Sequence, residues 1–193
     1  MDRRARGDRP VLTGSQTSGI DGVRLIELET RADRRGSFLE VFRQSWIGAG
    51  GGAVQANLSR STRGVLRGMH FHRGQWDYWC PIAGDAFVAL ADLRKGSPTW
   101  RDVMTLGLSG DDPRGLFIPP GVAHGFYATT EFVMVYLVDA YFDGSDEYAV
   151  AWDDPGFGIV WPAGDPILSD RDRENASLVE ALRTPPRYDR SLG

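Results

Sequence analysis

Two short segments decide the fold: residues 64–72 read GVLRGMHFH, and residues 118–126 read IPPGVAHGF. Together they contain all the histidines of the chain, His70, His72 and His124. Both segments are apolar and bounded by turn residues, as β-strands are. Because residues two apart in a strand point to the same face, His70 and His72 are expected to present their imidazoles side by side. The Pro-Gly turn before His124 would return the chain into a sheet.

Strand-like runs recur at short intervals through the rest of the chain. Residues 85–92 and 131–139 are apolar runs bounded by polar or turn residues, and 115–119 is a shorter run of the same kind. The 24 glycines and 11 prolines punctuate many short segments, and no long stretch keeps a helical apolar period. The pattern predicts an all-β sandwich or barrel with one short peripheral helix at 176–183.

Composition and charge exclude several classes of protein. With 193 residues, the chain is long enough for one core and short for two. No long apolar run is present, so neither a membrane-spanning helix nor a membrane partner is expected. Lys and Arg number 22 against 26 Asp and Glu, which disfavours a nucleic-acid binder with a broad basic surface. Because Cys80 is the single cysteine, any metal must be bound by histidines and carboxylates.

The N-terminal residues differ from the rest of the chain. Residues 1–19 are charged and contain no apolar stretch of the kind a secretory signal carries, so they are interpreted as a disordered or flexible arm. A cytoplasmic location follows as the expectation. The Gly-rich segment 47–53 is interpreted as a flexible loop too short to separate two domains. We therefore treat residues 20–193 as one folded domain.

The histidines and one nearby acid follow a known spacing. The order His-x-His, four residues, Asp77, six residues, Gly84, and later Pro-x-Gly-x-x-His resembles the double motif of the cupin superfamily. Cupins usually have Glu where this chain has Asp77, and Asn where it has Ala128. Imidazoles and a carboxylate suit Zn, Fe, Mn or Ni without choosing among them. The alternative, that these are packed and hydrogen-bonded strand histidines, stays open at this point.

The candidate metal ligands on that spacing are His70, His72, Asp77 and His124.

A more extensive resemblance covers residues 22–172. Six segments that appear in order carry it: 35–42, 55–61, 64–70, 88–98, 118–126 and 152–155. Together they resemble the dTDP-4-dehydrorhamnose 3,5-epimerase family, whose members act on nucleotide-linked 4-keto-6-deoxy sugars. The resemblance implies a cupin-type jelly roll, also called a double-stranded β-helix, and a homodimer. It implies no required cofactor.

The resemblance also implies catalytic residues. Epimerisation next to a ketone removes a proton from one face of the carbon and returns one to the other face. By match to the family, His70 is the base and Tyr136 the opposing acid, and both residue types suit these roles near neutral pH. The family's Ser-x-x-Asp stretch points to Asp172 as the acid that orients the base, with Asp170 as the near alternative. Taken alone, these two acids could equally be solvated residues before a helix.

Substrate-binding residues are implied in the same way. Arg67 and Arg35 would bind the diphosphate, since guanidinium groups match phosphate oxygens; for Arg35 a position on a partner subunit is left open. Residues that would line the rest of the path of a dTDP-linked sugar are Gln55, Asn57, His124, Phe142 and Arg171. Tyr141 is an alternative to Phe142 for stacking on the base, and either aromatic could instead belong to the core.

Two positions depart from the epimerase pattern. The family carries a lysine where this chain has Asp77, and usually a glutamine where it has His72. A carboxylate beside a forming enolate oxygen repels it unless a positive charge intervenes. Since both departures lead towards the metal-binding cupin pattern, we hypothesise that a divalent ion replaces the lysine. In that case His70 would be a ligand and no longer the base.

Three functions follow as alternatives. The first is an isomerase that epimerises C3, or C3 and C5, of a dTDP-4-keto-6-deoxyhexose in deoxysugar biosynthesis. The second is a metal-dependent cupin enzyme of the same lineage that catalyses a different reaction. The third is a non-catalytic module that binds a sugar nucleotide. The first is preferred because the ordered segments match an enzyme family along most of the chain.

Overall fold

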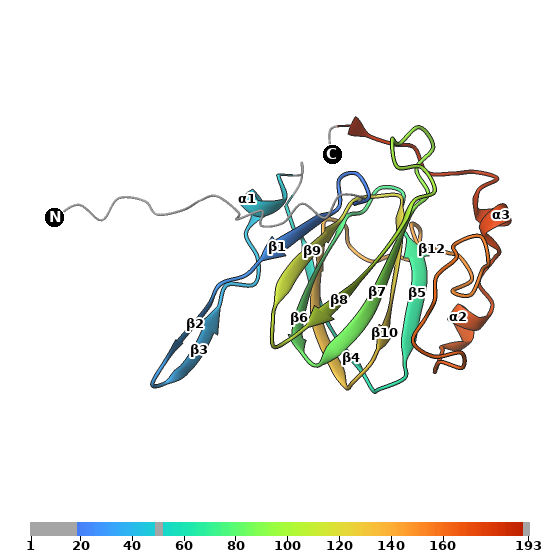
Figure 1. Ribbon diagram of the computed structural model, residues 1–193. Coiled ribbons are helices and arrows are strands. Elements are labelled where there is room, and N and C mark those ends of the chain that lie inside the picture. Colours follow the sequence, from blue (N-terminus) through green and yellow to red (C-terminus); the bar gives the residue numbers. More distant parts are fainter. Residues whose placement is uncertain (1–18, 49–51, 191–193) are drawn as a thin grey trace.

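Two antiparallel five-stranded sheets face each other in the computed structural model, which describes residues 19–48 and 52–190 (Figure 1). One sheet has the order β1 (Arg24–Glu27), β9 (Arg114–Ile118), β6 (Asp77–Ala83), β11 (Phe132–Val138) and β4 (Gln55–Ser61). The other has the order β12 (Tyr148–Ala149), β5 (Leu66–Phe71), β10 (Val122–Ala128), β7 (Asp85–Asp92) and β8 (Val103–Ser109). The all-β, jelly-roll prediction is confirmed.

The strands follow the apolar runs of the sequence. The run at 85–92 coincides with β7, and the run at 131–139 exceeds β11 by one residue at each end. The expected C-terminal helix is present as α3 (Leu178–Ala181), shorter than predicted. Two further short helices form, α1 (Gln44–Ile47) and α2 (Asp170–Arg173).

Three apolar clusters hold the layers together. The first lies between the sheets and includes Trp79, Leu90 and Phe126. A second cluster packs the C-terminal segment around α3 against the outer face of the β5 and β7 sheet, and a third packs α1 and its neighbours against the outer face around β6. Strands covered on both faces read as nearly continuous apolar runs, which is why β7 and β11 could be recognised in the sequence.

A short hairpin projects from this body. Strands β2 (Thr30–Asp33) and β3 (Gly36–Leu39) pair only with each other and extend away from the two sheets (Figure 1). Phe38 on β3 keeps 66% of its surface exposed. The hairpin therefore presents an apolar side chain that the described part of this chain leaves uncovered.

Parts of the domain prediction fall outside the described residues. Residues 1–18 belong to the predicted arm, and residues 49–51 to the predicted loop at 47–53. The division between an arm and a folded domain at residue 20 therefore stays a prediction. In the ranges 19–48 and 52–190, no helix has the length and apolar character needed to cross a membrane.

Candidate functional site

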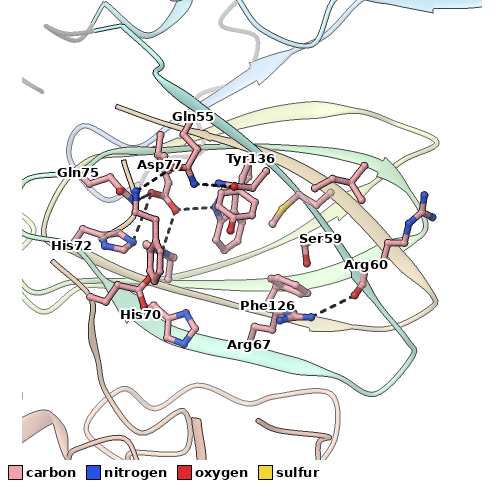
Figure 2. A pocket seen from close by; sticks show the side chains of 18 of the residues that line it. Gln55, Ser59, Arg60, Arg67, His70, His72, Gln75, Asp77, Phe126 and Tyr136 are labelled. Atoms are coloured by element: carbon pink, nitrogen blue, oxygen red, sulfur yellow. Dashed lines mark hydrogen bonds and ion pairs between the residues drawn. The ribbon is translucent and has the colours of Figure 1, made fainter. Parts of the chain in front are cut away.

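A cavity of about 560 Å³ opens between the two sheets. Its volume lies in the range of small-molecule sites, about 300–1,000 Å³. The side chains drawn in Figure 2 come from both sheets. Ten residues singled out from the sequence line it: Gln55, Asn57, Arg67, His70, His72, Asp77, His124, Tyr136, Phe142 and Arg171. The fold therefore brings nearly all of the predicted site residues to one place.

His70 lies on β5 and forms a hydrogen-bonded pair with Asp172 from α2. Its Nε2 is 2.6 Å from Asp172 Oδ1, and the Asp172 carboxylate is buried. Ser169 caps the start of α2, because its side chain accepts a hydrogen bond from the main-chain N–H of Asp172. Asp170 is exposed, so the structure favours Asp172 over the alternative at Asp170.

The pair has a defined protonation pattern. Burial by itself would raise the pKa of Asp172. The hydrogen bond from His70 and smaller contributions together lower it by more, so this pKa lies below its ordinary value. Asp172 is therefore ionised at neutral pH and accepts the Nε2 proton. In a neutral imidazole the other ring nitrogen, Nδ1, then carries the lone pair. His70 is thus arranged to accept a proton at Nδ1.

An irregularity in β5 brings Arg67 into the cavity together with His70. His124 of β10 pairs with His70, but Phe126, two residues further on, pairs with Arg67, three residues from His70. This register shift is a β-bulge, which re-aims side chains along a strand. As a result both Arg67 and His70 line the cavity, although their spacing would place them on opposite faces of a regular strand.

Tyr136 lies on the opposite wall. It belongs to β11 in the other sheet, where it is flanked by Asn57 of β4 and Trp79 of β6. Burial raises the pKa of Tyr136, and the negative charge of Asp77 raises it further. The phenol therefore stays protonated at neutral pH. A proton acceptor and a proton donor stand on facing walls of one cavity (Figure 2).

A second group of polar residues is buried in the same cavity. Asp77 Oδ2 is 3.5 Å from His124 Nε2, and Asp77 Oδ1 is 3.9 Å from His72 Nε2. Burial lowers the pKa of His124 to about 4, against the opposing effect of Asp77. Of the four metal ligands predicted from the sequence, the structure groups His72, Asp77 and His124 but not His70. The reason is that His70 Nε2 bonds to Asp172 instead.

The predicted binding residues line the cavity, with the exception of Arg35. Gln55 donates from Nε2 to Asn57 Oδ1 at 3.0 Å and accepts from the main-chain N–H of Phe142, so these residues form one rim of the cavity. Arg171, also at the cavity, forms an ion pair with Glu147. Arg35 is not brought to the cavity by this chain, because it lies in the β2–β3 turn and pairs with Asp33 at 2.6 Å.

Several cavity residues were missed in the sequence. Trp79 could have been found, because it lies two residues from Asp77 in a strand and so shares its face. Gln75 donates to Asp77 at 2.9 Å from a segment before β6, where no periodic pattern indicates a direction. Glu147 lies outside the regular strands as well. For these last two residues the sequence contains no usable signal.

Comparison with known proteins gives consistent results. The profile of the family described as dTDP-4-dehydrorhamnose 3,5-epimerase matches residues 17–180. The enzyme of that name from Methanothermobacter thermautotrophicus is 38% identical over 172 residues, which cover 84% of this chain and 93% of the relative. The dTDP-4-dehydrorhamnose 3-epimerase of Streptomyces niveus is 39% identical, with coverage of 84% and 83%.

Solved structures agree with the sequence comparison. NovW, a 4-keto-6-deoxy sugar epimerase from the novobiocin biosynthetic gene cluster of Streptomyces spheroides, superposes with a TM-score of 0.84 at 37% identity, covering 95% of this chain and 96% of its own. A Legionella pneumophila 3,5-epimerase solved with dTDP-4-keto-L-rhamnose has a TM-score of 0.81 at 34% identity, with coverage of 89% and 96%. The chain therefore belongs to the dTDP-4-dehydrorhamnose 3,5-epimerase family.

Proposed function

We propose that this protein is an isomerase that inverts C3 of a dTDP-linked 4-keto-6-deoxyhexose, a reaction of deoxysugar biosynthesis. One observation carries the proposal: a base oriented by a buried carboxylate and a protonated phenol face each other across a cavity, in a chain of an epimerase family. Proton removal and return on opposite faces of one carbon need this arrangement.

Each proton transfer can be assigned to an atom. His70 Nδ1 takes the proton from C3, and the electron pair of the C–H bond moves towards the C4 carbonyl to form an enolate. Asp172 stabilises the resulting imidazolium through Nε2. Tyr136 then donates its phenolic proton to C3 from the other face and recovers a proton from solvent, while His70 releases its proton to solvent. Each of these proton transfers uses only side chains of this chain and solvent.

C3 inversion is the part of the reaction on which the relatives agree. Among them are both a 3-epimerase and 3,5-epimerases, at nearly equal identity to this chain. C3 and C5 both adjoin the C4 ketone, so the same base and acid could act at either carbon. We therefore propose inversion at C3. Deuterium incorporation at C5 measures whether a second carbon is inverted.

The cavity also offers groups for the nucleotide. Arg67 donates from Nε to Ser61 at 3.1 Å, and its guanidinium keeps further N–H groups for diphosphate oxygens. Phe142 has 66% of its surface exposed at the cavity rim, where it can stack on the base. With Gln55, Asn57, His124 and Arg171, these residues form the proposed binding path.

The test is conversion of dTDP-4-keto-6-deoxyglucose in D₂O, followed by NMR. We expect product inverted at C3 with solvent deuterium at that carbon, and deuterium at C5 as well if two carbons react. Binding of the sugar nucleotide without any exchange would indicate a non-catalytic module. Turnover of another kind that requires a metal would indicate the alternative cupin enzyme. Either result would overturn the proposal.

We also propose that the protein is a homodimer, with the β2–β3 hairpin as a contact. The exposed ring of Phe38 and the projection of the hairpin from the body support this (Figure 1). In a dimer Arg35, at the hairpin turn, could reach the partner's cavity. Light scattering should give twice the chain mass, and Phe38→Asp should halve it. A wild-type monomer would contradict the proposal. Cytoplasmic location stays a prediction.

A further inference from the structure

Three buried side chains at the base of the cavity direct ligand atoms at one another. One ring nitrogen from each of His72 and His124 and one carboxylate oxygen of Asp77 lie within 4.8 Å of one another. The three residues are 5–8% exposed. Buried charge of this kind needs a partner of opposite sign, because an unpaired carboxylate is costly to remove from water.

The hydrogen bonds of the two rings show which nitrogens carry protons. His124 Nδ1 is 3.0 Å from the main-chain oxygen of Val122, and His72 Nδ1 is 2.6 Å from that of Asp146. A carbonyl oxygen can only accept, so both Nδ1 atoms donate. In the neutral rings each Nε2 therefore has a lone pair directed at Asp77. Lone pairs of two imidazoles that face a carboxylate repel it unless a proton or a metal ion lies between them.

From this geometry we infer that His72, Asp77 and His124 form a binding site for a divalent transition-metal ion. Bonds of about 2.1 Å in a tetrahedral arrangement would place ligand atoms about 3.4 Å apart. Asp77 Oδ2 is 3.5 Å from His124 Nε2, and the other oxygen, Oδ1, is 3.9 Å from His72 Nε2. One ligand atom from each residue lies within 4.8 Å of the others, so side-chain movements of about an ångström would bring three of them to bonding geometry.

The surroundings hold the ligands in that orientation. Histidine ligands commonly donate their second ring N–H to a main-chain carbonyl, as both rings do here. The carboxylate of Asp77 is fixed by Gln75 Nε2 at 2.9 Å and Trp79 Nε1 at 3.3 Å. Two imidazoles and one carboxylate form the ligand set of catalytic zinc and non-haem iron sites, in which further positions stay open.

The open positions would face the cavity that also contains His70 and Tyr136. On the basis of the proposed function, the ion would supply the positive charge that an enolate oxygen requires. Without it, Asp77 places a negative charge where negative charge develops, which disfavours the reaction. Since His70 lies outside the three-residue group, it can still act as the base while the ion is bound.

The experiment compares metal binding in matched variants of the full chain. The protein is stripped with a chelator and equilibrated with Co²⁺ or Zn²⁺, and metal content is measured together with the visible spectrum of the Co²⁺ form. We expect about one ion per chain in the wild type, and an affinity at least about tenfold lower in Asp77→Asn and His72→Gln. The matched control is His70→Gln, which removes a cavity imidazole but should keep the ion.

The outcomes separate this inference from the proposed function. Wild-type protein with fewer than about one ion per four chains after equilibration would overturn the metal site, as would equal metal content in His72→Gln and wild type. Such a protein could still exchange deuterium into the sugar, in which case the proposed function stands. Conversely, an ion bound without any exchange would support the site and contradict the function. Circular dichroism of each variant checks that loss of binding is not loss of fold. A rise in the Tm of the wild type on addition of Zn²⁺ shows that the ion binds the folded protein.

Discussion

The pairing of His70 with Asp172 assigns separate tasks to the two nitrogens of one ring. Nε2 is held by a buried carboxylate at 2.6 Å, and Nδ1 is left to accept a proton. In the proposed mechanism the carboxylate orients the ring and stabilises its charged form. We therefore propose Asp172 as a positioning residue, whose removal should affect the rate of proton transfer more than substrate binding.

We predict that Asp172→Asn lowers kcat by about 10²-fold to 10⁴-fold, the contribution typical of an organised general base, with little change in KM. Steady-state kinetics on the dTDP-4-keto-6-deoxy sugar measures both constants. Asp170→Asn is the matched control, because Asp170 lies in the same helix but is exposed, and it should keep wild-type kcat. A rise in KM with kcat unchanged would contradict the positioning role.

Some of the site could be predicted at the level of single residues. His70 lies in one of the ordered segments that resemble the family, and Tyr136 and Asp172 were assigned by match to the family's tyrosine and its Ser-x-x-Asp stretch. No periodicity would have linked residues so far apart in the chain. The alternation of strand side chains did predict that His70 and His72 share a face. It could not predict that His70 turns to Asp172 while His72 turns to Asp77, because that choice depends on where α2 packs.

At the scale of elements, the bulge in β5 determines which side chains line the cavity. Gly68 lies between Arg67 and His70 with φ +141°, and a Cβ placed there would lie 2.6 Å from the Cα of Gly125. Only glycine allows β5 and β10 to approach so closely at this backbone conformation. The bulge therefore depends on the identity of this residue.

We predict that Gly68→Ala destabilises the protein by about 1–3 kcal/mol and impairs catalysis, because the two strands must separate near His70. Urea unfolding measures the free energy, and deuterium exchange into the sugar measures the activity. Gly107→Ala in β8 is the control, since a Cβ there meets no atom within 4 Å. Equal stability of the two variants would contradict the account of the bulge.

Elements differed in how well the sequence predicted them. Strands β7 and β11 are covered on both faces, so their apolar runs are long and unambiguous. The β2–β3 hairpin is exposed along most of its length and offers no apolar alternation to detect. The helix α2 has four residues, Asp-Arg-Asp-Arg, and is defined by a cap rather than by an apolar face.

At the scale of the whole molecule, a buried ion pair links segments from both ends of the described chain. Arg94 and Asp92 are 2.7 Å apart and almost completely buried. Arg94 also donates to the main-chain oxygen of Asp21, and its guanidinium lies over the ring of Tyr188. Burial by itself would raise the pKa of Asp92. Hydrogen bonds from Arg94 and from neighbouring hydroxyl groups together lower it by more, so this pKa lies below its ordinary value.

We predict that the free energy of unfolding falls as the pH drops below about 4, through the native-state pKa of Asp92. A carboxylate whose pKa is lowered by folding binds fewer protons in the native state than in the unfolded state. Its contribution is therefore complete above the unfolded pKa and is lost in acid. Asp92→Asn should be less stable at neutral pH and show a shallower acid dependence in urea unfolding. An unchanged acid slope in this variant would contradict the assignment.

The central claim is that His70 and Tyr136 act from opposite faces of one bound sugar. The most direct measurement is NMR of dTDP-4-keto-6-deoxyglucose incubated in D₂O with Tyr136→Phe. The account predicts that His70 still exchanges the C3 proton, so that deuterium enters with the original configuration retained, while inverted product falls by about 10²-fold or more. Inverted product formed at the wild-type rate would contradict the claim.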